Sequence, residues 1–157
     1  MRPRQAPVSD GDRAGMAAAL AAARRGEATG EVPVGAAVIV DGRVVSAAHN
    51  ETVARRDLTQ HAELIAIQRA LQTTGVDRLD RATLYVTLEP CAQCAGAIVL
   101  ARVGKVIFGA FDPKAGMAGS VGDLLRHPRL NHRPEVRGGV MADECGALLA
   151  DFFASRR

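Results

Sequence analysis

The sequence predicts an α/β protein in which helices cover a mixed β-sheet. An opening β-hairpin is followed by strand-like segments that alternate with helical ones, which is typical of a sheet packed between helices. The length of 157 residues and the hydrophobic content of 48% suit one domain with a sizeable core. We therefore expect one domain over residues 13–157, after a loose N-terminal segment at residues 1–12 that contains prolines and no apolar pattern.

Five segments have strand patterns. Val34–Val40 is a continuous apolar run rich in β-branched residues, Asp41-Gly42 is a strong hairpin signal, and Arg43–Ala48 pairs back. The three later strands are expected at Thr83–Thr87, Lys105–Phe108 and Glu135–Arg137.

Helices are expected between and around these strands. Met16–Ala23 is apolar and follows several arginines, but it is mostly alanine and has no clear cleavage site, which favours a first helix over a signal peptide. No stretch approaches the roughly 20 apolar residues that a membrane span requires. Two further helices are expected at His61–Gln72 and Ala92–Ala101. A final amphipathic helix is indicated by Met141, Cys145, Leu148, Leu149 and Phe152, which recur at helical spacing.

Two short motifs carry the chemistry of the chain: His61-Ala62-Glu63 and Pro90-Cys91-Ala92-Gln93-Cys94. Together they supply three zinc ligands, His61, Cys91 and Cys94. A structural zinc site usually closes all four positions with protein ligands, whereas a catalytic site leaves the fourth for water. The pattern is that of zinc-dependent nucleobase deaminases, in which the glutamate moves protons and does not bind the metal. Glu63 has that position.

The spacing of the motifs predicts where they lie. Cys91 and Cys94 are three residues apart, so at the start of a helix both thiolates can face one metal. The positive end of the helix dipole favours their ionised form. His61 and Glu63 are two apart and would point to different sides in mid-helix, so we expect them at a helix start.

Other readings of the cysteines are weaker. A lone Cys-x-x-Cys can be a redox pair or half of a four-cysteine zinc site, but the chain has only three cysteines. The third, Cys145, stands in an apolar helical stretch and fits the core. His127 and His132 could complete a structural site, but they lie far along the chain in a segment rich in proline and arginine.

Beyond these motifs, the chain resembles the bacterial tRNA-specific adenosine deaminases over nearly all residues after the first dozen. The matching stretches are Glu31-Val32-Pro33-Val34-Gly35, Asn50, His61-Ala62-Glu63, Tyr85 to Cys91, Cys94 to Ala97, Phe108-Gly109-Ala110, Asp112, Gly119-Ser120, Asn131-His132-Arg133, Ala142 to Cys145 and Asp151-Phe152-Phe153. The zinc motif alone marks the wider deaminase superfamily, and the later stretches indicate the branch that acts on tRNA.

The resemblance implies a three-layer cytidine-deaminase-like fold with a five-stranded mixed sheet, and one zinc ion per subunit. It also implies hydrolysis of the wobble adenosine of tRNA to inosine with release of ammonia. Asn50 matches the residue that hydrogen-bonds the target nucleoside, and Asp112 matches one near the flanking loop nucleotides. Phe153 stands where family residues approach the anticodon loop. A homodimer is expected from the family as well.

Three positions depart from the family pattern. Leu58 replaces a frequent proline, Gln93 replaces a frequent methionine, and Phe111 stands where a polar or basic residue is common. None of the three is a ligand or the acid/base. The net charge of +3 is compatible with an RNA partner but does not require one. The low cysteine count, with two assigned to metal, favours the cytoplasm.

Two alternatives of other classes stay open at this point. A deaminase of a free base, nucleoside or nucleotide, of guanine or cytosine type, would share the zinc motif and differ in the pocket. A non-catalytic, zinc-stabilised RNA-binding protein would not need Glu63.

Overall fold

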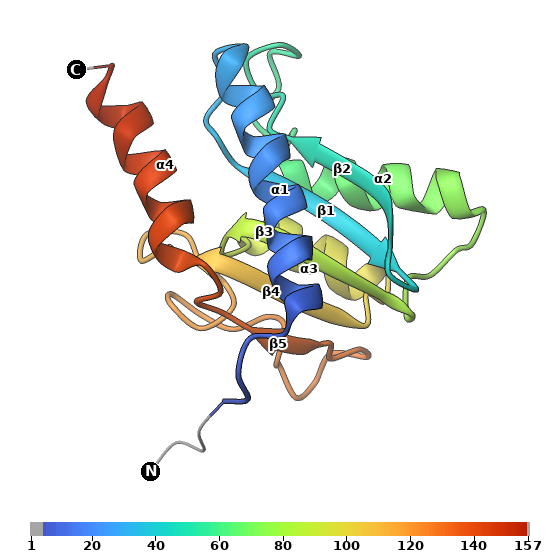
Figure 1. Cartoon of the computed structure of the whole chain (residues 1–157). Helices are drawn as coiled ribbons and strands as arrows, with labels where there is room; N and C mark the ends of the chain where they lie inside the picture. The colour runs from blue at the N-terminus through green and yellow to red at the C-terminus, as the bar shows by residue number, and fades with distance from the viewer. Residues whose placement is uncertain (1–4, 157) are drawn as a thin grey trace.

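The computed structural model describes residues 5–156 and contains four helices and five strands in the order that the sequence predicts (Figure 1). Their bounds are α1 Asp10–Ala28, β1 Gly35–Val40, β2 Arg43–His49, α2 Ala62–Thr74, β3 Ala82–Leu88, α3 Ala92–Leu100, β4 Lys105–Ala110, β5 Glu135–Arg137 and α4 Ala142–Ala154. Within the described residues, no helix is both long enough and apolar enough to cross a membrane.

The sheet is mixed, with strand order β2-β1-β3-β4-β5. β1 runs antiparallel to β2 and β3, whereas β3, β4 and β5 are parallel. α1 and α4 lie side by side on one face, and α2 and α3 cover the other (Figure 1). Each face has its own cluster of buried apolar side chains, the larger one under α2 and α3. The predicted three-layer fold with a five-stranded mixed sheet is therefore confirmed.

Most element bounds agree with the sequence patterns to within two residues, and α1 shows the clearest difference. It begins at Asp10 because the hydroxyl of Ser9 accepts a hydrogen bond of 3.0 Å from the amide of Asp12. Residues 10–12 are thus helical, although the sequence pattern placed them in the loose segment. Residues 1–4 of that segment lie outside the described residues.

The hairpin between β1 and β2 follows the chemistry of its turn. Asp41 and Gly42 both have positive φ, 50° and 75°, as a type I′ turn requires. β2 pairs back so that Gly35 lies opposite His49. The first residue of β1 and the last of β2 therefore lie at the same edge of the sheet.

That edge is where the chain gathers its polar motifs. β3 and β4 are parallel and joined by the α3 crossover, so their carboxyl ends also meet there, with Leu88 opposite Ala110. In open α/β sheets, ligands bind in the crevice outside the carboxyl ends of the strands. The segments that follow β2, β3 and β4 at this edge contain, respectively, Asn50 and His61, then Cys91 and Cys94, and then Asp112.

Candidate active site

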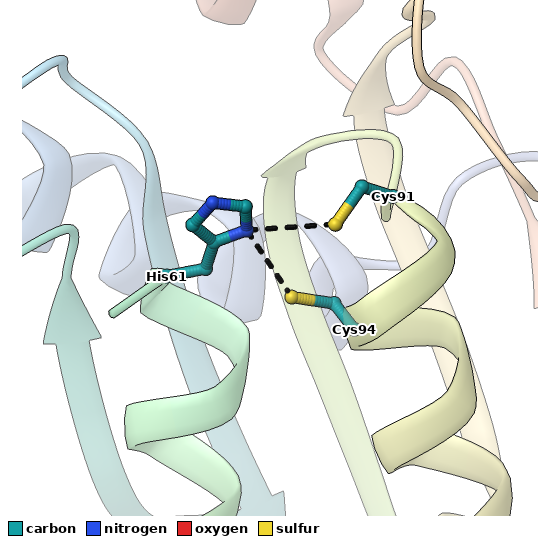
Figure 2. A group of neighbouring side chains, drawn as sticks. All are labelled: His61, Cys91 and Cys94. Atoms are coloured by element: carbon teal, nitrogen blue, oxygen red, sulfur yellow. Dashed lines mark hydrogen bonds between the residues drawn. The ribbon is translucent and has the colours of Figure 1, made fainter. Parts of the chain in front are cut away.

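Two helix N-termini hold the three predicted metal ligands. His61 is the N-cap residue of α2, and Cys91 is the N-cap residue of α3, with Cys94 in the first turn of the same helix. Neither cap side chain bonds to its own helix, so the imidazole and the thiol are free to face each other. Figure 2 shows both cysteine sulfurs directed at one nitrogen of the His61 ring.

The distances fit a tetrahedral zinc site. The Nδ1 atom of His61 lies 3.5 Å from the Sγ atom of Cys91 and 3.5 Å from that of Cys94. Two ligands held at the tetrahedral angle by Zn–S and Zn–N bonds of ordinary length would be about 3.5–3.6 Å apart. Across the described residues, these three are the one group of His, Cys, Asp and Glu whose ligand atoms converge, all within 4.8 Å.

The three ligand groups share protons. Hydrogen bonds from Cys94 and then from His61 lower the pKa of Cys91. Donation to Cys91, followed by burial, raises the pKa of Cys94, and the hydrogen bond with Cys91 raises the pKa of His61. A divalent cation would replace these protons and meet two thiolates and a neutral imidazole, which is the ligand form that zinc prefers.

The other histidines and the third cysteine that could have been metal ligands make different contacts. His132 bonds through Nε2 to the carbonyl of Val103 at 2.6 Å, and the Nδ1 atom of His127 accepts from the amide of Arg129 at 3.1 Å. Cys145 is 1% exposed, and its sulfur packs against Gly109 of β4. Neither histidine completes a site with the cysteine pair, and Cys145 belongs to the core as expected.

A cavity of about 390 Å³ opens beside the ligands. It is lined by Val32, Val34, Asn50, Thr52, Leu58, His61, Glu63, Leu88, Glu89, Cys91, Asp112 and Ala115. Glu63, in the first turn of α2, is 4% exposed, and burial raises its pKa to about 7. A carboxyl group of that pKa can both take and give a proton near neutral pH.

Asn50 lies at the floor of this cavity, 9% exposed. Its Oδ1 atom accepts a hydrogen bond of 2.9 Å from the amide of Ala62, one of the N–H groups that the start of α2 leaves unpaired. Since Oδ1 is engaged, the Nδ2 amide is the group that can donate to a ligand. Asn50 therefore holds the helix that carries His61 and Glu63 while it lines the same cavity.

Asp112 also lines the cavity, and Glu89 holds its loop. The buried Glu89 carboxylate accepts from the amides of Asp112 (3.0 Å), Ala118 (3.0 Å) and Ser120 (3.1 Å) and from the Ser120 hydroxyl. Burial alone would raise the pKa of Glu89, but these hydrogen bonds outweigh it and lower the pKa. Glu89 thus fixes the loop of residues 112–120.

Glu31 does the same for residues 52–54, a role that the sequence patterns missed. It is 1% exposed, and its carboxylate accepts from the amides of Val53 (3.0 Å) and Ala54 (2.8 Å) and from the hydroxyl of Thr52 (3.3 Å). The available signal was an acidic residue that opens the Glu-Val-Pro-Val-Gly stretch, directly before a strand buried on both faces. Thr52 also lines the cavity.

Phe153 is not among the cavity residues. It lies in the last turn of α4 and is 52% exposed, whereas its neighbour Phe152 is 5% exposed. The Arg156 guanidinium stacks on the Phe152 ring, 3.7 Å from the centroid. Packing therefore uses Phe152 and leaves the Phe153 ring available, while Arg157 lies outside the described residues.

A mixed sheet with His-x-Glu at the start of one helix and Cys-x-x-Cys at the start of the next defines a deaminase of the cytidine-deaminase-like fold. The family model of MafB19-like deaminases matches residues 11–157. The tRNA-specific adenosine deaminase of Bacillus subtilis is 47% identical over 90% of this chain and 88% of that protein. The chain belongs to the tRNA-specific adenosine deaminase family.

Solved structures of deaminases have the same fold. A structure from a study of A-to-I editing by tRNA:A34 deaminases has a TM-score of 0.83 and 40% identity, covering 87% of this chain and 99% of that one. The guanine deaminase of Bacillus subtilis is more distant, with a TM-score of 0.62 and 28% identity over 92% of each chain.

The metal site can be tested with two matched cysteine substitutions. Cys91→Ala removes one of three ligands, so bound zinc should fall well below one per chain, and added zinc should no longer raise the Tm, because metal binding contributes to folding. Cys145→Ala makes the same chemical change in the core and should keep both properties. Metal analysis and thermal unfolding with zinc or chelator would show this, and full zinc in Cys91→Ala would contradict the assignment.

Glu31→Gln should destabilise the protein by about 2 kcal/mol at neutral pH, because the charged hydrogen bonds that the buried carboxylate accepts are lost. Burial favours a higher pKa for Glu31, but hydrogen bonds from Val53, Ala54 and Thr52 lower it below the ordinary 4.5. The contribution of Glu31 is therefore complete above pH 4.5 and declines as the pH falls through the folded-state pKa.

The control is Glu135→Gln, a change at a carboxylate whose side chain is 80% exposed. Urea unfolding at neutral pH and below pH 4.5 should give a difference between the two variants that shrinks in acid. Both variants contain the same metal ligands, so the effect of ligand protonation on stability cancels when the two variants are compared. A difference that stays constant with pH would show that the ionised Glu31 does not hold the loop.

Proposed function

We propose that this protein deaminates the wobble-position adenosine of tRNA to inosine by hydrolysis and releases ammonia. The observation that carries this proposal is a buried Glu63 in the cavity beside the converging side chains of His61, Cys91 and Cys94, in a chain that belongs to the tRNA-specific adenosine deaminase family. The cavity of about 390 Å³ lies in the size range of small-molecule sites and suits one nucleoside. A tRNA-modifying role places the protein in the cytoplasm.

His61, Cys91 and Cys94 are the residues that would hold zinc. Zinc bound there supplies a water molecule of lowered pKa as the nucleophile at neutral pH. Glu63 takes the proton of this water as its oxygen bonds to C6 of adenine, and passes that proton to the ring nitrogen N1. Glu63 then takes the remaining proton from the new C6–OH group and delivers it to the exocyclic amine, so that the C6–N bond breaks, C6 becomes a carbonyl, and ammonia leaves. Water and adenosine are thereby converted to inosine and ammonia.

The other walls position the base. Asn50 can donate from Nδ2 to the nucleoside, since its Oδ1 atom is engaged by Ala62. Asp112 also lines the cavity, and Glu89 fixes its backbone. Because Glu63 is almost completely buried, the adenine must enter the cavity away from its neighbours, which is easier in a single-stranded loop than in a duplex.

Glu63→Gln should abolish inosine formation, with a loss of at least about 100-fold, and should leave bound zinc unchanged, because the carboxylate moves protons without being a ligand. The measurement pairs inosine analysis on an anticodon stem-loop carrying adenosine at the wobble position with metal analysis. Guanine, cytosine and free adenosine serve as competing substrates for the wild-type protein. Loss of zinc in Glu63→Gln would contradict the assigned role, and faster turnover of a free base would favour the small-molecule alternative.

A homodimer is the expected assembly, and one exposed surface suits a second copy. On α3, Gln93, Gly96, Ala97 and Leu100 face outward at helical spacing. Gln93 bonds to the carbonyl of Thr59 at 2.8 Å, next to the 84% exposed Leu58. At the other end, Leu100, 83% exposed, lines a hollow together with Leu130. This stripe of apolar and small residues extends from Leu58, which lines the catalytic cavity, to the hollow at Leu100, where Arg102 and Arg129 also contribute to the lining.

Leu100→Glu should convert the dimer to a monomer in sedimentation at micromolar concentration, since an unpaired charge buried in an apolar contact opposes pairing. Val76→Glu is the matched control, because Val76 is 48% exposed and lies outside the stripe. A wild-type monomer that still forms inosine would refute any need for a second subunit.

Phe153 is proposed to contact the RNA from the end of α4. Its exposed ring can stack on an unpaired base, a contact worth about 1–3 kcal/mol, and the arginines that follow would add a salt-dependent attraction. Removing residues 153–157 should weaken binding of the stem-loop and flatten its salt dependence, while zinc content stays the same. Equal affinity of the shortened and full-length proteins at low and high salt would exclude this role.

A further inference from the structure

A second hollow of about 780 Å³ lies beyond the loop that walls the catalytic cavity. The residues lining it are Gln5, Phe108, Phe111, Ala118, Gly119, Ser120, Asp123, Arg126 and Gly138. None of them is among the residues that line the catalytic cavity. The two spaces nevertheless share one support, because Glu89 accepts hydrogen bonds from Asp112 on the catalytic side and from Ala118 and Ser120 on the other.

Phe111 presents a fixed aromatic ring to this hollow. It follows the last residue of β4 and is 58% exposed. The ring packs edge-to-face on the buried Phe108, with centroids 5.2 Å apart and an angle of 88° between the planes. A ring held by its neighbour at this angle keeps an orientation without being covered, so its exposed face is ready to stack.

The polar side of the hollow is close to neutral. Arg126 donates through one terminal nitrogen to Asp123 at 2.8 Å and to the carbonyl of Ala118 at 3.1 Å. The guanidinium has further N–H donors, and the Asp123 carboxylate and the Ser120 hydroxyl can accept. An ion pair of this kind attracts a phosphate weakly but offers donors and acceptors to the edge of a heterocyclic base.

The hollow and the catalytic cavity are lined by two consecutive residues of the chain. Phe111 directly precedes Asp112, and consecutive Cα atoms are about 3.8 Å apart. Asp112 lines the catalytic cavity while Phe111 lines the hollow. Phe111 is therefore one residue away from the wall of the catalytic cavity, a separation that an adjacent nucleotide can span.

We propose that this hollow binds the unstacked base of a nucleotide adjacent to the target adenosine, with Phe111 as its stacking platform and the Asp123–Arg126 pair at its edge. The proposal rests on the proposed function, because it concerns the same RNA substrate. Bases of single-stranded RNA are commonly held by stacking on aromatic side chains.

The test measures binding and inosine formation with an anticodon stem-loop, using Phe111→Ala, Phe111→Leu and Phe111→Trp. Loss of stacking should raise the Kd by about 5- to 150-fold in the Ala and Leu variants, whereas Trp should retain affinity. Leu keeps apolar bulk against Phe108 but has no aromatic face, so it separates stacking from packing. Val121→Ala, at an apolar residue of the same loop that is 57% exposed, should bind like the wild type.

A second experiment removes the base that would stack on the Phe111 ring. Stem-loops with an abasic site on the 5′ or the 3′ side of the target adenosine should bind the wild type more weakly for one of the two sides. The same abasic site should not weaken the binding of Phe111→Ala any further, because two changes that remove one contact are not additive.

The outcomes separate the two proposals. A wild-type protein that neither binds the stem-loop nor forms inosine would overturn the proposed function and this site with it. Normal inosine formation with unchanged affinity in Phe111→Ala, or additive losses for both abasic sites, would overturn the base site alone. A changed sedimentation coefficient in Phe111→Ala would assign the ring to a subunit contact and would also overturn it.

Discussion

The site depends on one constraint, which is that two helices on the same face of the sheet begin at the same edge. α2 starts at His61 and α3 at Cys91, so an imidazole and two thiols meet 3.5 Å apart at the positive ends of two helix dipoles. These dipoles favour ionised thiols, and two thiolates balance the charge of one divalent cation. A partly buried site of this composition is electrically neutral, and it therefore limits the cost of removing charge from water.

The walls around this centre are loops, and two buried glutamates keep them in place. Glu31 binds the backbone of residues 53 and 54, and Glu89 binds that of residues 112, 118 and 120. Loops are usually the least stable parts of a fold, but here each has several amide hydrogens directed at one desolvated carboxylate. The loop parts of the cavity wall can thus keep their shape beside the parts that α2 and β3 supply.

The sequence predicted the fold and the convergence of His61, Cys91 and Cys94 because both arise from local patterns. The apolar run before Asp41-Gly42 specifies a hairpin, and the short spacing of His61-Glu63 and of Cys91-Cys94 requires helix starts, where the structure has them. Glu31 was not predicted, because its partners at residues 52–54 lie across a chain reversal that no periodicity encodes. The start of α1 differed for a local reason, since the hydroxyl of Ser9 caps a helix that begins before the apolar run Met16–Ala23. The second hollow combines Gln5 with residues 108–138, so its existence depends on tertiary packing alone.

The depth of Glu63 explains why the substrate needs more than one contact. At 4% exposure, this carboxylate can reach only a base that has left the stack of its neighbours, and unstacking costs a few kcal/mol. The catalytic cavity, at about 390 Å³, accommodates the target but offers no surface to the base from which it was separated. An exposed aromatic ring such as Phe111, one residue from the cavity wall, can offset that cost by giving the separated neighbour a new stacking partner. A single-stranded loop lowers the same cost from the side of the RNA, so enzyme and substrate would each contribute part of the energy needed to extract the base.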